Sequence, residues 1–335
     1  MTRLCVAKVA VMLVVVGSTC VSHRLAFCST RTCPAIVAYT AENGGRYGLN
    51  IYSEGVSAMP FLPLSKVDRP VLLGYAGDSS TWVFCDESFT MPASLVLYNG
   101  KRMSRVALQS FPMSAAGYLT ISAVCGENVV IPAVESGQLV IYGYSLSGKG
   151  LYRRVLRVPH SQFEYVVADH IAVAADGSVA ASLIVAGTFH SPVPDSRLYV
   201  FDPRGKVLFA AKDGGRATIS HDGKRVAYQP TPDTIAIADI KTHKRQAVSV
   251  WPQRSAKASE RLGRFVAFRW DSRHDWLLCA YDHVIDTTYL PVFAVDLKSR
   301  GKQWKRLPID VDAWRWVLLD EMPKPLSGPT GSTKR

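Results

Sequence analysis

Residues 217–251 read ATISHDGKRVAYQPTPDTIAIADIKTHKRQAVSVW, and this stretch decides the fold because it holds one complete repeating unit. Asp222 and Gly223, in its first turn, are residue types that adopt the backbone conformations of a tight hairpin. Pro230 and Pro232 interrupt the chain before the third apolar segment. The segments that we expect to form strands are residues 217–220, 225–229, 234–239 and 246–250. Four short antiparallel strands of this kind make one blade of a β-propeller.

The pattern of this unit recurs on both sides of it with a period of about 45 residues, a length typical of propeller blades. Asp176 and Gly177 supply the same turn one unit earlier. No segment shows sustained helical periodicity. We therefore expect an all-β protein, a six-bladed β-propeller of four-stranded blades, over residues 34–320. The strands of the six blades are expected within residues 35–62, 71–108, 118–158, 165–211, 217–250 and 265–308.

The last apolar segment, residues 313–319, follows a sixth blade that is already complete. Its place in the repeat is that of an innermost strand, which the first blade lacks. We expect it to close the ring against the N-terminal blade, because closure removes an open sheet edge. Residues 24–28 are the rival candidate for this position. Trp314 and Trp316 alternate along the closing strand, where we expect core packing.

Two motifs resemble the repeat of the TolB-type, WD40-like propellers. Residues 219–228, ISHDGKRVAY, are similar to the family's Ser-Pro-Asp-Gly-Lys turn and the apolar strand after it, with His221 in place of proline. Residues 198–206 and 292–298 resemble the end of its third strand. The chain departs from the family in blades two and three, which lack the Asp-Gly turn, and we find no counterpart of the small N-terminal domain of TolB. The resemblance implies a propeller fold and a general binding role, and it carries over no catalytic residue.

The N-terminus has the three-part layout of a secretory signal peptide. Arg3 and Lys8 accompany an apolar run at residues 9–16, and small residues follow. The run is shorter than the roughly 20 residues that a membrane-spanning helix needs. We expect residues 1–22 to be removed and the mature protein to be exported, periplasmic or secreted, without a transmembrane segment. As a minor alternative, Cys20 would carry the lipid anchor of a lipoprotein.

Five cysteines follow the expected cleavage site, so they cannot all pair. Cys28 and Cys33, in the lead-in at residues 23–33, could form a disulfide in an oxidising compartment. We expect buried thiols at Cys85, Cys125 and Cys279. At the other end of the chain, residues 321–335 are rich in Pro, Gly, Ser and Lys and read as a disordered tail.

The formal net charge is +12, so an anionic polymer or surface is a partner to consider. One set of cations lies in the turns between third and fourth strands, which would place them on one outer rim of the propeller. Lysine in such turns also discourages edge pairing. The cations of this set are Lys101, Arg102, Lys149, Arg204, Lys206, Lys241, Lys244, Arg245, Lys298, Arg300 and Lys302. A second basic cluster, on the other face, comprises Arg254, Lys257, Arg261 and Arg264. Aromatic residues do not interleave with these turns, which disfavours nucleic acid as the partner.

Two loops on one face carry side chains suited to a ligand or a metal ion. His190 and Asp195 lie in the loop of blade four, and Asp282, His283 and Asp286 lie in the matching loop of blade six. Matching loops share a face, so these residues could gather at the channel mouth and hold Ca²⁺ or Zn²⁺. Solvated loop residues are the commoner origin of such a pattern, and we expect no obligatory cofactor.

Catalytic motifs are lacking from the sequence: it has no Gly-x-Ser-x-Gly elbow and no His-Glu-x-x-His. Residues 143–149 have phosphate-loop spacing, but Gly150 stands where Ser or Thr is required. The first hypothesis is therefore an exported, non-enzymatic scaffold that presents a loop face to a protein partner. The alternative is a propeller hydrolase or lyase that acts on a sugar or lactone at the channel mouth, with or without a metal ion.

Overall fold

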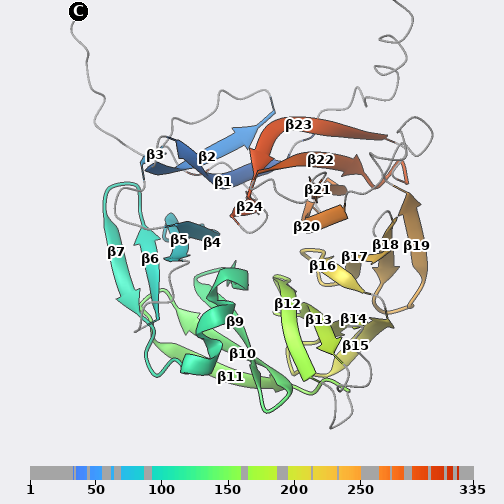
Figure 1. The fold of residues 1–335 in the computed structure, drawn as a ribbon, viewed down its shortest axis with the longest axis horizontal. Coiled ribbons are helices and arrows are strands. Elements are labelled where there is room, and N and C mark those ends of the chain that lie inside the picture. The colour runs from blue at the N-terminus through green and yellow to red at the C-terminus, as the bar shows by residue number, and fades with distance from the viewer. Residues whose placement is uncertain are drawn as a thin grey trace, which may run out of the picture.

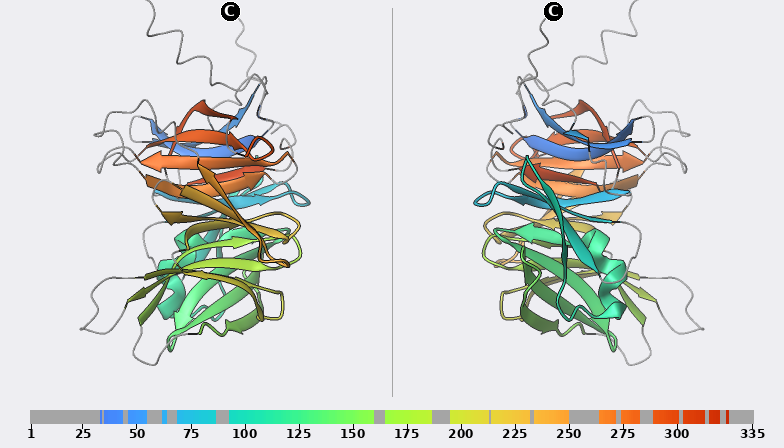
Figure 2. Two further views of the ribbon diagram at one scale, coloured as in Figure 1. Left: turned by 90° about the vertical axis from the view of Figure 1, so that its right-hand side faces the viewer. Right: turned by 90° about the vertical axis from the view of Figure 1, so that its left-hand side faces the viewer.

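The computed structural model contains six four-stranded antiparallel sheets arranged in a ring (Figure 1). It describes residues 33–319, apart from 34, 44–45, 55–61, 64–68, 87–92, 160–164, 187–194, 213, 232–233, 250–263, 272–273, 283–288, 301–302 and 313–314, together with Pro323. Seen from the side, the blades stack on one another around the ring (Figure 2). The prediction of an all-β, six-bladed propeller is confirmed.

Each of the first three blades has four strands, which follow one another from the channel outward. Blade one consists of β24 (Trp316–Leu319), β1 (Ile36–Asn43), β2 (Arg46–Ser53) and β3 (Leu62–Pro63). Blade two consists of β4 (Pro70–Ala76), β5 (Thr81–Asp86), β6 (Ser94–Tyr98) and β7 (Met103–Ala107). Blade three consists of β8 (Ala123–Cys125), β9 (Asn128–Glu135), β10 (Gln138–Ser145) and β11 (Gly150–Leu156), and the short helix η1 (Met113–Ile121) precedes it.

The last three blades follow the same order. Blade four consists of β12 (Tyr165–Val173), β13 (Val179–Ala186), β14 (Asp195–Phe201) and β15 (Val207–Lys212). Blade five consists of β16 (Gly215–Ile219), β17 (Arg225–Thr231), β18 (Thr234–Asp239) and β19 (Arg245–Ser249). Blade six consists of β20 (Arg264–Asp271), β21 (Trp276–Asp282), β22 (Leu290–Asp296) and β23 (Gln303–Val311).

The position of a strand in its blade explains its sequence pattern. Middle strands such as β9 and β10 are buried on both faces by the neighbouring blades, so their apolar runs are almost continuous. Outermost strands are covered on one face and alternate. In β23, Leu307, Ile309 and Val311 are buried and the residues between them are exposed.

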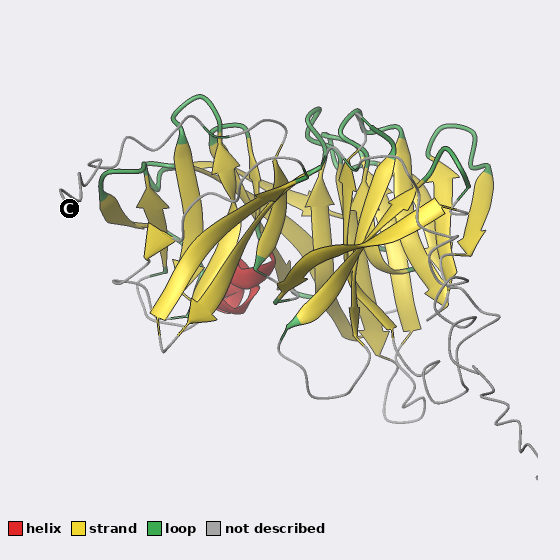
Figure 3. Cartoon of the chain, turned by 90° about the horizontal axis from the view of Figure 1, so that it is seen from above, coloured by secondary structure: helices red, strands yellow, loops and turns green. Residues whose placement is uncertain are grey.

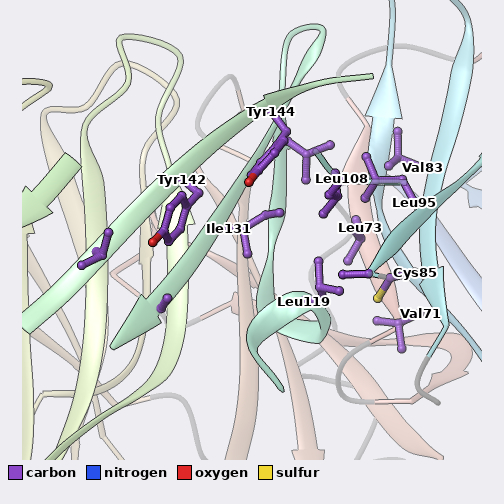
Figure 4. Packing of buried hydrophobic residues seen from close by; sticks show 14 residues of the cluster. Val71, Leu73, Val83, Cys85, Leu95, Leu108, Leu119, Ile131, Tyr142 and Tyr144 are labelled. Atoms are coloured by element: carbon purple, nitrogen blue, oxygen red, sulfur yellow. The ribbon is translucent and has the colours of Figure 1, made fainter. Parts of the chain in front are cut away.

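The core of the ring lies between its blades. The buried apolar side chains of the described residues form six clusters, and each cluster joins two adjacent blades. Figure 4 shows the cluster between blades two and three, where Leu73 and Leu95 of blade two approach Leu119 and Ile131. Because each blade packs on two neighbours, closure of the ring completes the core.

The predicted closing strand is confirmed. β24 pairs antiparallel with β1, from Ile36 opposite Leu319 to Tyr39 opposite Trp316. Trp316 is fully buried in the cluster between blades six and one, as the expected core packing requires. Trp314 and the rival residues 24–28 lie outside the described residues.

Blade three differs from the expectation that its strands begin at residue 118. The chain forms a 3₁₀ helix there, η1, and leaves only three residues to β8. Leu119 of this helix is 7% exposed and packs into the core beside blade two. The Ser122 N–H donates to the Leu119 carbonyl at 3.1 Å and ends the helix. Tertiary packing of apolar residues therefore overrides the local strand pattern.

Candidate functional site: the central channel

A cavity of about 730 Å³ runs along the axis of the ring. Its wall contains residues from the innermost strand of every blade: β24, β4, β8, β12, β16 and β20. Much of the wall is apolar, with Leu72, Ile171 and Val317 as examples. The volume falls within the roughly 300–1,000 Å³ of cavities that bind small ligands. The channel is therefore the candidate binding site of the protein.

One end of the ring carries two sets of short turns. In an antiparallel blade, the connections between first and second strands and between third and fourth strands lie at the same end. We call this end the turn face. Figure 3 shows described loops, in green, gathered along one side of the ring. The cavity reaches the turn face, where Gly77, Gly126, Ala175 and His221 contribute to its wall.

Arg269 brings a guanidinium group into the wall of the cavity. It lies on β20, two residues before Asp271 ends that strand at the turn face, and it is partly exposed. Its Nε donates to the Trp316 carbonyl at 3.3 Å and its Nη1 to the Phe268 carbonyl at 2.9 Å. The Cζ atom lies 5.0 Å from the centre of the Trp316 ring. Burial lowers the pKa of Arg269 to about 10, so the group is still charged at neutral pH.

His170, on β12, also lines the cavity and is 6% exposed. Burial lowers its pKa well below the ordinary value, and the positive charges of Arg269 and Arg216 lower it further. Arg216, on β16, lies with its Nη1 3.6 Å from Oδ2 of Asp169. Blades four, five and six thus direct basic groups at one region, in which His170 is neutral at neutral pH.

Four carboxylates lie on the turn face beside the wall of the cavity, in addition to Asp271, which is part of that wall. Each belongs to the residue that directly follows a residue of the wall: Asp78, Glu127, Asp176 and Asp222. We call this set the carboxylate ring. Desolvation raises the pKa of Asp222, but hydrogen bonds from Ser220 and Lys224 and the charge of Lys224 lower it, and the net direction is downward. The Asp222 carboxylate is therefore ionised at neutral pH.

The predicted turn residues lie in this ring. Gly177 and Gly223 have φ of 83° and 66°, where a residue without Cβ is favoured. Asp176 accepts a hydrogen bond from the Ser178 N–H at 2.8 Å. Asp222 accepts one from the Ser220 hydroxyl at 2.7 Å. The same aspartates therefore shape the turns and place negative charge at the mouth of the cavity.

An outer rim of cations lies beyond the carboxylate ring on the turn face. These side chains are exposed and lie in or beside the turns between third and fourth strands of five blades, as predicted from the sequence. The described members are Lys101, Arg102, Lys149, Arg204, Lys206, Lys241, Lys244, Arg245, Lys298 and Arg300. The turn face thus combines a central cavity, an inner set of acids and an outer set of bases.

Of the five residues predicted as ligand or metal candidates, Asp195 and Asp282 lie toward the other end of the ring. For Asp195, at the start of β14, and Asp282, at the end of β21, only the backbone is described. His190, His283 and Asp286 lie outside the described residues. No group of three His, Cys, Asp or Glu side chains that could hold a metal ion occurs among the residues that are described. The proposed gathering of these five residues stays a prediction.

The second basic cluster also stays a prediction. Arg264 begins β20 and only its backbone is described, whereas Arg254, Lys257 and Arg261 lie outside the described part of the chain. The same holds for Cys28, so its pairing with Cys33 stays a prediction. Of the other cysteines, Cys85 and Cys279 are fully buried and Cys125 is partly buried.

Sequence reasoning missed Arg269 and His170. One signal was present: both are basic residues inside largely apolar innermost strands, FVAFRWD and YVVADHIAV. A basic residue in such a strand is a candidate for the channel wall, because the channel is a more polar surrounding than the apolar interface with a neighbouring blade. Residues 143–149 fall in β10 and the turn after it, a hairpin and not a strand-to-helix junction, so the phosphate-loop interpretation stays rejected.

Comparison with known proteins supports the architecture. The chain matches no protein-family profile and no curated protein sequence. TolB from Acinetobacter baumannii is similar in structure, with a TM-score of 0.53 and 16% identity over 85% of this chain and 66% of that chain. The chain therefore spans just under two thirds of the length of that TolB.

Two other solved structures are similar at lower scores. The first is a nidogen/laminin complex, with a TM-score of 0.48 and 10% identity over 86% of this chain and 99% of that chain. The second is an oligogalacturonate lyase in complex with manganese, with a TM-score of 0.46 and 11% identity over 84% of this chain and 74% of that chain. Within the described residues, no helix has the length and apolarity needed to cross a membrane. The closed ring of six four-stranded blades and the structural similarity to TolB show that the chain has the fold of a TolB-like, six-bladed β-propeller.

Proposed function

We propose that the protein is a non-enzymatic β-propeller scaffold, exported from the cell that makes it, that binds a protein partner on its turn face. The observation that carries this proposal is the organisation of that face. A cavity, a carboxylate ring and an outer rim of cations lie on one surface. Opposite charges in a fixed arrangement give a surface specificity for one partner and fast association with it.

Hydrogen bonds between turns hold the turn face in place. The Ala175 N–H donates to the His221 carbonyl at 3.0 Å and joins the turns of blades four and five. The Ile240 N–H donates to the Lys224 carbonyl at 2.9 Å and joins the inner and outer turns of blade five. A surface that is ordered before binding loses less conformational entropy on binding. The turn face is therefore suited to recognition without rearrangement.

Site-specific photo-cross-linking in living cells of the source organism tests the proposal. A photoreactive residue replaces Asp78 or Lys241 on the turn face, or Leu151 on β11 as the matched control. All three positions are exposed. We expect one discrete adduct, of the same size, from both turn-face positions and none from the control. Adducts from Leu151 alone, or from no position, would refute the assignment of the partner to the turn face.

Export is tested separately, because it concerns the N-terminus and not the turn face. The basic start and apolar run of the first 22 residues support it. We expect the mature protein to start near residue 23 and to fractionate outside the cytoplasm. N-terminal sequencing of the purified protein measures the first, and cell fractionation the second. A cytoplasmic protein that retains Met1 would show the export assignment to be wrong.

The volume of the cavity favours one second function, a hydrolase or lyase that acts on a sugar or lactone. A cavity of about 730 Å³ is large enough for such a substrate. Turnover of a sugar or lactone panel by the purified protein, lost when Ala172 in the cavity wall is replaced by tryptophan, would replace the scaffold proposal by this one. Ala172 lines the cavity and is partly exposed, so the larger side chain fills space that a substrate needs.

A further inference from the structure

We propose that the cavity binds the carboxylate end of a peptide segment whose preceding residues are basic, with Arg269 as the partner of the carboxylate. The inference rests on the proposed binding function and names the chemistry of the segment that the partner inserts. It follows from three observations: the unused donors of Arg269, the charges around it, and the carboxylate ring at the mouth.

The guanidinium of Arg269 has donors to spare. Arginine carries five N–H donors, and the bonds to the Trp316 and Phe268 carbonyls use two of them. Among the described residues, no carboxylate forms an ion pair with Arg269. The remaining donors lie on Nη1 and Nη2, the fork that a carboxylate accepts in a bidentate arrangement. Because Arg269 is part of the cavity wall, a ligand in the cavity can reach this fork.

The charges around Arg269 favour an anion. The charges that act on His170 come from Arg269 and Arg216, and both are positive. Asp169 pairs with Arg216 at 3.6 Å, so these two charges compensate each other. Asp271, which is part of the cavity wall, contacts Nδ1 of His274 at 2.9 Å. Arg269 is therefore the arginine of the cavity wall that no described acid pairs with, and an anion in the cavity can supply its counter-charge.

The carboxylate ring restricts which anions reach the site from the turn face. A polyanion would pass four carboxylates and be repelled. A ligand with one carboxylate at its tip and cations directly behind it is attracted by Arg269 and by the carboxylate ring, whereas the cations of the outer rim lie beyond both. Arg269 lies two residues inside the end of β20, which corresponds to about 7 Å of extended chain. The basic residues of the ligand should therefore precede its terminal carboxylate by about two residues.

Fluorescence anisotropy with labelled peptides tests the inference on the mature protein. The first peptide ends in Lys-Lys-Ala-Ala with a free C-terminal carboxylate, the second is its C-terminal amide, and the third ends in Glu-Glu-Ala-Ala with a free carboxylate. We expect the first peptide to bind and the other two to bind at least tenfold more weakly. Equal binding of the acid and the amide would overturn the carboxylate assignment without any variant of the protein.

Variants locate the site. Arg269→Gln should weaken the binding of the free-acid peptide to the level of its amide. Arg269→Lys should retain part of the difference in affinity between the acid and the amide, because it keeps the positive charge. Arg315→Gln is the matched control: Arg315 is 9% exposed, lies over the Tyr47 ring and next to Asp312, and is not part of the cavity wall. It should leave the preference for the acid unchanged. Circular dichroism shows which variants are folded, and only those are compared.

The source of the carboxylate is distinguished by competition. Acetate and succinate at millimolar concentration should not displace the lysine peptide. If they displace it and the glutamate peptide binds as well as the lysine peptide, the cavity accepts small carboxylates and the peptide assignment is wrong. If no peptide binds while the turn-face positions still give a cross-linked adduct, this inference fails and the proposed scaffold function stands.

Discussion

Replacing His170 with glutamine should make the stability of the protein less sensitive to mild acid. The imidazole is 6% exposed, and its pKa is lowered first by burial and then by the charges of Arg269 and Arg216. The unfolded chain takes up a proton on this residue below its ordinary pKa of about 6.5, whereas the folded protein does not. Stability is therefore fully present above that pH and is lost as the pH falls below it.

The size of the effect follows from the linkage relation. One proton that only the unfolded state binds costs about 1.4 kcal/mol per pH unit once the pH is well below 6.5. Between pH 7 and pH 5 the free energy of unfolding should fall by about 2 kcal/mol through this residue alone. His170→Gln removes this contribution, while other groups titrate as before.

Urea unfolding of the wild type and of H170Q at pH 7 and pH 5 measures the difference. Thr218→Val is the control, because Thr218 lines the same cavity and does not titrate. The control should lose as much stability as the wild type between the two pH values, and H170Q about 2 kcal/mol less. If H170Q and the wild type lose the same amount, His170 is not held neutral by its surroundings and the account of the basic region is wrong.

Three further substitutions test the packing of the ring. A Cβ on Gly74 would lie 2.6 Å from the Cβ of Val124, so Gly74→Ala should destabilise the protein by about 1–3 kcal/mol in urea unfolding. Gly77→Ala is the control: its Cβ would have no described atom within 4 Å, and it should change the free energy of unfolding by less than about 0.5 kcal/mol. Trp316→Ala should lower the free energy of unfolding by about 3–5 kcal/mol because the side chain is fully buried. Trp316→Phe should lower it much less, because the indole N–H has no hydrogen-bond partner among the described residues. Calorimetry should therefore give midpoints that fall in the order wild type, Phe variant, Ala variant. Leu151 is 47% exposed on the outer strand β11, so Leu151→Lys should leave stability unchanged and reduce self-association in light scattering; a loss of stability would contradict the exposure.

The fold could be predicted from the sequence because its signals are local and repeated. Asp222 and Gly223 mark a turn wherever the pair occurs between apolar segments, and the same pair at Asp176 and Gly177 gives the period. The closing strand followed from its place in the repeat, and its pairing with β1 confirms it. Blade three was the exception, since the burial of Leu119 decides between helix and strand there and burial is not a local property.

The candidate site could not be predicted in the same way. Asp176 and Asp222 were recognised as turn residues, but a ring of carboxylates exists only when the turns of four blades meet around one axis. Arg269 stood out only as a basic residue in a largely apolar strand, and its place in the cavity wall could not be predicted because the direction of a side chain on an innermost strand depends on register and on the closed ring. Properties of single blades are encoded locally, whereas properties of the channel arise from the assembled ring.

The pairing of β24 with β1 also fixes the order in which the molecule can be assembled. Ile36 and Leu319 lie about 280 positions apart in the sequence, and joining the ends of such a loop costs about 5 kcal/mol of chain entropy. Each other blade pairs strands that are neighbours in the sequence and forms as soon as its own segment is available. Blade one alone stays incomplete until the final strand has left the ribosome. A growing or shortened chain that ends before Trp316 therefore leaves β1 with one edge unpaired, and the last step of folding is a single event in which β24 pairs with β1.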